Sequence, residues 1–178
     1  MITLLLATMV VVPMLYEWWV STRNERELRA QGAVEPSGDV YALMQVIYPA
    51  SFLAIIFECA RRDPSRDMLV AAGFTIFVGA KVLKYWAIGT LGVRWTFRVL
   101  VPPASALVAG GPYRVVRHPN YVAVLGELVG AALIAHAVVA GPVAVLVFGV
   151  LILLRIRVEE RALGLEGQRA ALSKTDVR

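Results

Sequence analysis

The sequence predicts an all-α integral membrane protein with five transmembrane helices. Hydrophobic residues make up 58% of the 178-residue chain, whereas soluble globular proteins contain about 45–50%. They gather in five blocks, most of which approach the length of about 20 residues that a spanning helix needs. Most charged residues lie between these blocks. We therefore interpret residues 1–178 as a single membrane domain, with three spans in residues 1–88 and two more in residues 89–178.

The first block covers residues 2–20 and differs from a cleaved signal peptide. It lacks a basic amino-terminal region and a small-residue cleavage site. Tyr16, Trp18 and Trp19 near its end suit the aromatic belt of a membrane interface. We expect this block to be retained as the first span.

The second and third blocks complete the amino-terminal half. The second covers residues 41–60, where we expect Pro49 to interrupt the helix because proline removes a helical hydrogen bond. The third covers residues 68–88 and carries Lys81 and Lys84 on its last turns.

The last two blocks, residues 121–139 and 142–156, predict a helical hairpin. Between them, Gly141 and Pro142 favour a tight turn. Because the two helices would run antiparallel, the start of the fourth span should lie beside the end of the fifth.

Basic residues in the predicted loops indicate the orientation, since lysine and arginine favour the cytoplasmic side. With the amino terminus outside, the cytoplasmic segments hold twelve basic residues and the outer loops hold three. Residues 89–120 and the carboxy-terminal tail then face the cytoplasm. We expect a multi-pass protein of a bacterial inner membrane, in contact with membrane lipids.

Several classes of function are disfavoured by composition. The net charge of +5 suits anionic lipids better than nucleic acid, because the basic residues cluster at the ends of apolar blocks. The lone Cys59 excludes an intrachain disulfide. His118 and His136 are the only histidines and lie 18 residues apart, so we expect no metal site.

The long loop before the fourth span is expected to be ordered. Its stretch "RWTFRVLV", residues 94–101, has the aromatic and β-branched content of a strand. An amphipathic segment lying on the membrane surface is an equal alternative.

The stretch "RHPNY", residues 117–121, predicts the start of the fourth span. Pro119 suits the first turn of a helix, which places Arg117 and His118 at its entrance. Exposed N–H groups at a helix amino terminus attract a carboxylate or another anion. The alternative is a basic anchor at the membrane interface.

The stretch "RIRVEER" ends the fifth span with the adjacent acids Glu159 and Glu160. Arg155 lies four residues before Glu159, so the two can pair. A carboxylate here could accept hydrogen bonds from ribose hydroxyls or pair with an ammonium group, unless the run is only a solvated collar. The hairpin should bring this acidic pair beside His118 and its neighbours, and such a mixture of charges suits a zwitterionic ligand.

Glu127 lies inside the fourth span, where a carboxylate is costly and therefore a candidate for function. It shares a helix face with Asn120 and Ala123, which would direct it along the same wall as the helix entrance. A structural ion pair with Lys84 or Arg155 is equally compatible. The surrounding pattern from Gly126 to Gly130 indicates close helix packing.

At these residues the sequence resembles the isoprenylcysteine carboxyl methyltransferase family. The family motif has the form R-H-P-x-Y-x-G, followed by a hydrophobic stretch and E-E. The matching residues are Arg117, His118, Pro119, Tyr121, Glu159 and Glu160. Ala123 takes the place of the motif glycine. Residues 91–163 resemble in particular a bacterial branch encoded beside type III polyketide synthases.

The resemblance implies an integral membrane methyltransferase with five spans. S-adenosylmethionine would lie between the last two spans, a cytoplasmic loop and a carboxy-terminal helix. The candidate cofactor-binding residues are Gly111, Tyr113, His118, Pro119, Tyr121, Arg155, Glu159 and Glu160. Candidate catalytic residues are Arg117, which would orient a carboxylate acceptor, together with Glu127 and Glu159.

The expected activity is therefore O-methyl transfer to a lipophilic acceptor that enters from the bilayer. The acceptor is a prenylcysteine-type carboxylate or the hydroxyl of an alkylpyrone or alkylresorcinol. Two other functions are compatible with the sequence: a membrane reductase that uses NAD(P)H on a lipid substrate, and a non-catalytic membrane scaffold.

Overall fold

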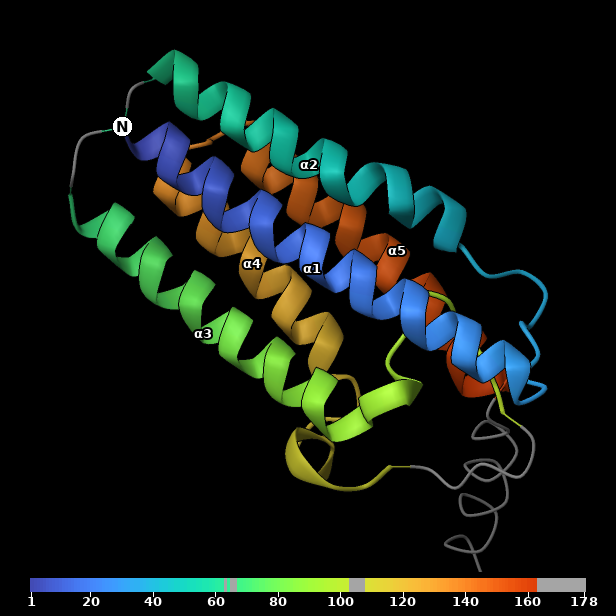
Figure 1. Cartoon of the computed structure of the whole chain (residues 1–178). Helices are drawn as coiled ribbons and strands as arrows, with labels where there is room; N and C mark the ends of the chain where they lie inside the picture. Colours follow the sequence, from blue (N-terminus) through green and yellow to red (C-terminus); the bar gives the residue numbers. More distant parts are fainter. Residues whose placement is uncertain (63, 65–66, 103–107, 163–178) are drawn as a thin grey trace, which may run out of the picture.

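The computed structural model describes residues 1–62, 64, 67–102 and 108–162. Its helices are α1 (Ile2–Ala30), α2 (Tyr41–Arg62), α3 (Met68–Leu91), α4 (Pro119–Ala135) and α5 (Ala140–Ala162). Two short 3-10 helices, η1 (Gly92–Arg94) and η2 (Gly111–Arg114), lie between α3 and α4. The predicted all-α membrane fold is confirmed, and Figure 1 shows the five α-helices side by side in one bundle.

The five predicted blocks all form helices, with different boundaries. Within the described residues, α1, α2, α3 and α5 are long and apolar enough to cross a membrane, whereas α4 is a shorter apolar helix of 17 residues. The expected interruption at Pro49 is wrong, because α2 continues through this residue. The predicted carboxy-terminal helix falls on residues 163–178, which lie outside the described part of the chain.

The turn of the hairpin also differs from the prediction. Helix α4 ends at His136, which adopts the left-handed conformation with a φ of 50°. Gly141 and Pro142 belong to the first turn of α5, where proline is tolerated because no helical donor is lost there. The Glu58 carboxylate of α2 accepts the Ala140 N–H at 2.8 Å, so it caps this helix start.

The stretch after η1, for which a strand and an amphipathic surface segment were equal alternatives, is a loop held by α1. Among the described residues, its only β-sheet pairing is an isolated antiparallel bridge between Val34 and Val101. Asn24 donates to the Trp95 carbonyl at 2.8 Å, and Ser21 accepts the Phe97 N–H at 2.8 Å. The polar face of α1 therefore takes the place of a neighbouring strand.

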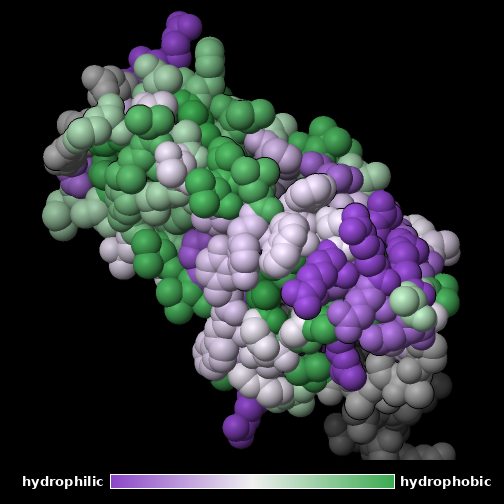
Figure 2. Space-filling model, in the orientation of Figure 1, coloured by the Kyte–Doolittle hydropathy of each residue, from purple (hydrophilic) through white to green (hydrophobic). Residues whose placement is uncertain are grey.

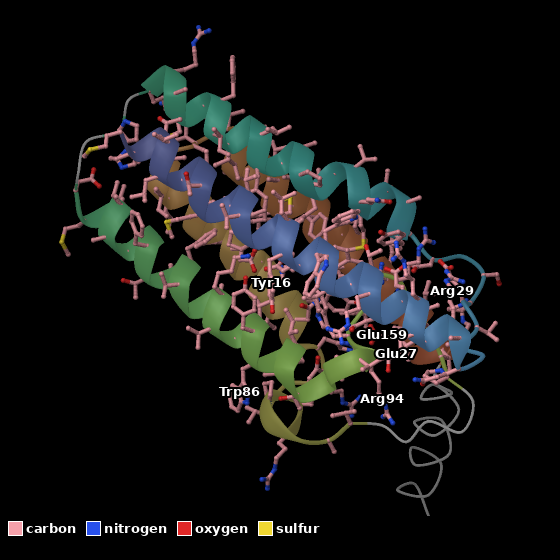
Figure 3. The ribbon with its side chains drawn as sticks, viewed as in Figure 1. Tyr16, Glu27, Arg29, Trp86, Arg94 and Glu159 are labelled. Atoms are coloured by element: carbon pink, nitrogen blue, oxygen red, sulfur yellow. The ribbon has the colours of Figure 1, made fainter. Side chains whose placement is uncertain are left out.

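Charged side chains gather at one end of the bundle, where α1 ends, α2 begins and α5 ends. Glu27, Arg29, Arg94 and Glu159 lie there in Figure 3, whereas Tyr16 lies nearer the middle of the bundle. Figure 2 shows hydrophilic residues over this end and mostly apolar residues over the rest of the visible face. We call it the polar end.

Helices α3 and α4 approach at backbone distance, as the glycine pattern predicted. A Cβ atom added to Gly130 would lie 2.7 Å from the Phe77 nitrogen and 2.8 Å from the Gly73 carbonyl oxygen. A Cβ atom on Gly73 would meet Ile134 in the same way, at 2.7 Å from its backbone nitrogen. The small residues thus fix the position of α4, on which the candidate site is built.

Gly130→Ala is expected to destabilise the protein by about 1–3 kcal/mol, because the two backbones must separate to admit the methyl group. Gly79→Ala is the matched control, since a Cβ atom there meets nothing within 4 Å. That change should leave stability unchanged or raise it slightly. Thermal unfolding in detergent measures both, and equal midpoints for the two variants would contradict the close approach.

Candidate functional site

A cavity of about 450 Å³ lies at the polar end, between the loop after α3, the start of α4 and the end of α5. We call it the polar cavity. Its charged and polar lining includes Tyr113, Arg117, His118, Tyr121, Arg155, Glu159 and Glu160. Seven of the predicted site residues therefore meet around one space, although they come from distant parts of the chain.

His118 stands at the entrance of α4, where Pro119 is the first helical residue, as predicted. Its ring stacks on Tyr121 with centroids 5.5 Å apart. Its Nδ1 lies 3.7 Å from Glu159 Oε2, and its Nε2 lies 3.6 Å from Glu160 Oε1. The predicted convergence of the helix entrance with the acidic pair is thus confirmed. His118 Nε2 is buried and has no hydrogen-bond partner among the described residues.

The Tyr121 hydroxyl joins Arg155 to Glu159. It donates to Glu159 Oε2 at 2.8 Å and accepts from Arg155 Nε at 3.0 Å. The direct pair that the spacing of Arg155 and Glu159 allowed is not formed, because the guanidinium extends toward α2 and the loop instead. Its Nη1 lies 3.3 Å from Asp39, and its Nη2 donates to the Phe97 carbonyl.

The remaining predicted residues occupy different positions around the polar cavity. Tyr113 lines it, and burial together with the nearby Glu159 carboxylate raises the pKa of the Tyr113 phenol. Arg117 also lines it and is exposed. Gly111 has a φ of 53°, and a Cβ atom there would lie 2.4 Å from Thr90 Oγ1. Gly111 therefore shapes the loop and Pro119 begins α4, and neither residue belongs to the cavity lining.

Glu127 does not share the wall of the polar cavity. It lies deep in the bundle, 1% exposed, where its carboxylate is 3.0 Å from Lys81 Nζ and 3.1 Å from Lys84 Nζ. Both lysines also pair with Glu17 of α1, at 2.8 and 2.7 Å. Two carboxylates and two ammonium groups thus form a closed ring. Of the partners considered for Glu127, Lys84 is correct and Arg155 is not.

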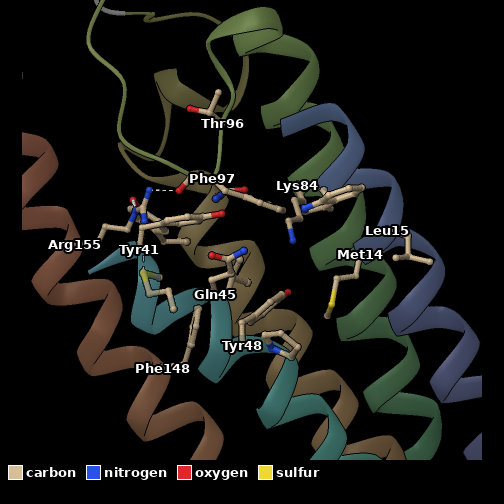
Figure 4. Close-up of a pocket in the computed structure, with 16 residues that line it drawn as sticks. Met14, Leu15, Tyr41, Gln45, Tyr48, Lys84, Thr96, Phe97, Phe148 and Arg155 are labelled. Carbon is tan, nitrogen blue, oxygen red and sulfur yellow. Dashed lines mark hydrogen bonds between the residues drawn. The ribbon is translucent and has the colours of Figure 1, made fainter. Parts of the chain in front are cut away.

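A second cavity of about 480 Å³ lies between α1 and α2 and reaches α4 and α5. We call it the apolar cavity, because it is lined largely by apolar residues such as Met14, Leu15, Val124 and Phe148. The close-up in Figure 4 shows the side chains that surround it.

The two cavities share one wall. The residues that line both are Thr96, Asn120, Tyr121 and Arg155. Asn120 is fixed at this wall because its side chain accepts from Trp95 Nε1 at 3.3 Å. A charged space and an apolar space therefore meet at a few side chains.

The apolar cavity includes residues that the sequence analysis missed. Tyr41, Gln45 and Tyr48 of α2 all line it. Their spacing of four and three residues places them on one helix face. Polar groups on one face of an apolar span are the sequence feature that could have identified them. Asn120 could have been found as the polar residue inside the motif "RHPNY".

A family model for the isoprenylcysteine carboxyl methyltransferase (ICMT) family matches residues 71–164. The chain belongs to this family. The matched region contains α4, the described part of α5 and every predicted site residue. Membership in the ICMT family indicates a methyltransferase embedded in a membrane.

Two curated proteins are similar to this ICMT-family chain over most of its length. Protein YpbQ of Bacillus subtilis, described as uncharacterized, is 32% identical over 161 residues, which cover 89% of this chain and 95% of YpbQ. An uncharacterized protein of Haemophilus influenzae is 26% identical over 149 residues, or 83% of this chain and 87% of that protein. No solved structure gives a significant match.

Proposed function

We propose that the protein is a multi-pass, S-adenosylmethionine-dependent O-methyltransferase that acts on a lipophilic acceptor. The observation that carries this proposal is the wall shared by the polar and apolar cavities. A charged cofactor and a lipid substrate need separate environments that meet at the reacting atoms. Thr96, Asn120, Tyr121 and Arg155 form such a meeting point.

The polar cavity has the side chains that this cofactor requires. Glu159 and Glu160 suit an ammonium group and ribose hydroxyls, and Arg117 suits a carboxylate. The unpartnered Nε2 of His118 is available for a further hydrogen bond. When bound, the cofactor supplies an activated methyl group on a sulfonium, which is transferred by in-line displacement.

The protein's contribution to such a transfer is alignment and exclusion of water. Through the Tyr121 hydroxyl, Arg155 holds the Glu159 carboxylate in place. Arg117 lines the polar cavity and is absent from the apolar lining, so we place it with the cofactor and not with the acceptor.

The acceptor enters the apolar cavity from the bilayer, between α1 and α2. Leu15 and Trp18 line this cavity and are also exposed, by 61% and 54%, so the space reaches the outer surface of the bundle. We assign the polar cavity to the cytoplasmic side of the membrane, an assignment that the basic residues at the polar end support.

The charges around the apolar cavity favour a hydroxyl acceptor over a carboxylate. Arg155 and Lys84 are the cations in its lining. Arg155 is bound to Asp39, Tyr121 and the Phe97 carbonyl. Lys84 lies between two carboxylates. Since both cations are already paired, a neutral hydroxyl such as that of an alkylresorcinol suits this cavity better than a carboxylate. The candidate bases, His118 and Glu159, line the polar cavity, so the proton would cross the shared wall to reach either of them.

Calorimetry of the detergent-purified protein with S-adenosylhomocysteine tests the cofactor. Binding is expected for the natural sequence, and Glu159→Gln should weaken it roughly 10- to 100-fold, because a charged hydrogen-bond partner is lost. Glu27→Gln, an equivalent change on the exposed face of α1, should leave the affinity unchanged. Folded protein that binds NADPH but not S-adenosylhomocysteine would replace this proposal with a reductase.

A labelled-methyl assay then identifies the acceptor group. A methyl ether, stable in base, is expected from a hydroxyl acceptor. A base-labile methyl ester would show that the acceptor is a carboxylate.

A further inference from the structure

Beyond its shared wall, the apolar cavity is also lined by polar side chains. They include Tyr41, Gln45 and Tyr48 of α2 and Lys84 of α3. In Figure 4 Gln45, Tyr48 and Lys84 lie around the space between the helices. Around them the lining is apolar and includes Met14, Leu15, Pro49 and Phe148. The cavity therefore has a polar part within a predominantly apolar enclosure, as a ligand with a polar head and a hydrocarbon tail requires.

Gln45 is an exposed amide in a helix that is long and apolar enough to span a membrane. Among the described residues its side chain has no hydrogen-bond partner. In addition, Pro49 has no N–H group to donate to the Gln45 carbonyl four residues earlier. Unpaired polar groups are costly at membrane depth. A ligand that bonds to this amide would remove that cost.

Tyr48 offers a complementary group with a fixed position. Its hydroxyl donates to Glu127 Oε2 at 2.7 Å, so its oxygen can still accept a hydrogen bond. Its ring packs against Phe52 and Phe148, each with a centroid distance of 5.0 Å. Gln45 and Tyr48 are three residues apart, which makes them neighbours on the helix surface.

These two side chains together match a hydroxyl group. The Gln45 amide can donate a hydrogen bond, and the Tyr48 oxygen can accept one. The cations of the lining do not compete, because Arg155 and Lys84 are held in ion pairs. A hydroxyl is both donor and acceptor, whereas a carbonyl would use Gln45 alone.

We propose that Gln45 and Tyr48 are specificity-determining residues that bind a second hydroxyl of the acceptor. The preferred acceptor is then a dihydroxy aromatic ring with a long alkyl chain. One hydroxyl is methylated at the shared wall, and the other lies between Gln45 and Tyr48. This inference rests on the proposed methyltransferase function and on its hydroxyl acceptor.

A matched pair of acceptors tests the inference with the full-length protein in lipid nanodiscs. The probes are 5-pentadecylresorcinol and 3-pentadecylphenol, which differ by one hydroxyl. With labelled S-adenosylmethionine, kcat/KM should be roughly tenfold or more higher for the resorcinol, as expected for two neutral hydrogen bonds. Gln45→Leu and Tyr48→Phe should each lower this preference roughly three- to tenfold, mainly by raising KM for the resorcinol.

The controls separate recognition from folding. Val46→Leu changes an exposed neighbour that does not line the cavity, so it should keep the wild-type preference. Affinity for S-adenosylhomocysteine should be the same in every variant. If Tyr48→Phe fails to fold, Gln45→Leu alone tests the inference. Gln45→Leu is expected to fold because it places an apolar side chain on a membrane helix.

The possible failures are distinguishable. Absence of S-adenosylhomocysteine binding would remove the methyltransferase proposal itself. If S-adenosylhomocysteine binding is normal, three results would overturn the proposed role of Gln45 and Tyr48. They are equal use of the two acceptors by the wild type, methylation of neither acceptor, and an unchanged preference in Gln45→Leu. A 4-hydroxy-6-alkyl-2-pyrone is a third acceptor to compare. If it is methylated better than the resorcinol, and its methylation depends on Gln45 but not on Tyr48, the dihydroxy preference is also overturned.

Discussion

Lys84→Met is expected to lower the free energy of unfolding by about 3–5 kcal/mol, because it leaves an unbalanced buried charge. Lys84 is 1% exposed and lies between Glu17 and Glu127. Glu17 Oε2 and Glu127 Oε1 are buried and have only this ammonium as an ion-pair partner within the described residues. Without Lys84, the two carboxylates would share Lys81, and the ring would carry a net negative charge. Thermal unfolding in detergent measures the loss.

Restoring neutrality should recover part of this loss. The double variant Lys84→Met with Glu127→Gln keeps the pair between Lys81 and Glu17 and has no net charge. It should be more stable than the sum of the two single changes implies, by at least 1 kcal/mol. Strict additivity would show that the ring is not a coupled unit.

Arg155→Met is expected to reduce methyltransferase activity roughly 100-fold or more, since a buried, hydrogen-bonded charge contributes several kcal/mol. Arg155 is 4% exposed and contacts four parts of the structure: Asp39, Met44, Phe97 and Tyr121. Its loss leaves Asp39 without this partner and frees the Tyr121 hydroxyl, so the wall between the cavities loses its shape. The labelled-methyl assay measures the effect.

Two further variants identify the reason for such a loss. Arg155→Lys retains a positive charge near Asp39 but cannot bridge Tyr121 and Phe97 together. It should therefore recover stability and little activity. Arg157→Met, an exposed arginine two residues further along α5, should change neither. Full activity in Arg155→Lys would mean that only the charge matters and that the geometry of the wall does not.

Local sequence features predicted the parts of the site that depend on neighbouring residues. Pro119 defined the start of α4, and the hairpin brought His118 toward Glu159 and Glu160. These predictions needed only helix geometry and chain direction. The direct pairing of Arg155 with Glu159 that their spacing allowed does not form, because Asp39 and the Phe97 carbonyl, from distant segments, bind the guanidinium instead.

Features that depend on packing among several helices were not predictable in the same way. The sequence left open whether Glu127 had a function or a structural partner, because helix rotation decides which lysine faces it. The apolar cavity combines segments of all five α-helices with the loop at Thr96 and Phe97. The strand content of that loop was misleading, since Ser21 and Asn24 of α1 satisfy its backbone groups.

The length of α4 sets the depth of the proposed chemistry. A helix of 17 residues is about 25 Å long, whereas the hydrocarbon core of a bilayer is about 30 Å thick. If the Ala135 end of α4 lies at one membrane surface, the end that bears His118 and Tyr121 does not reach the other surface. It would then lie below the lipid headgroups unless the bilayer thins around it. An amphiphile could then be modified while its chain stays among the acyl tails, so turnover would not require its extraction into water.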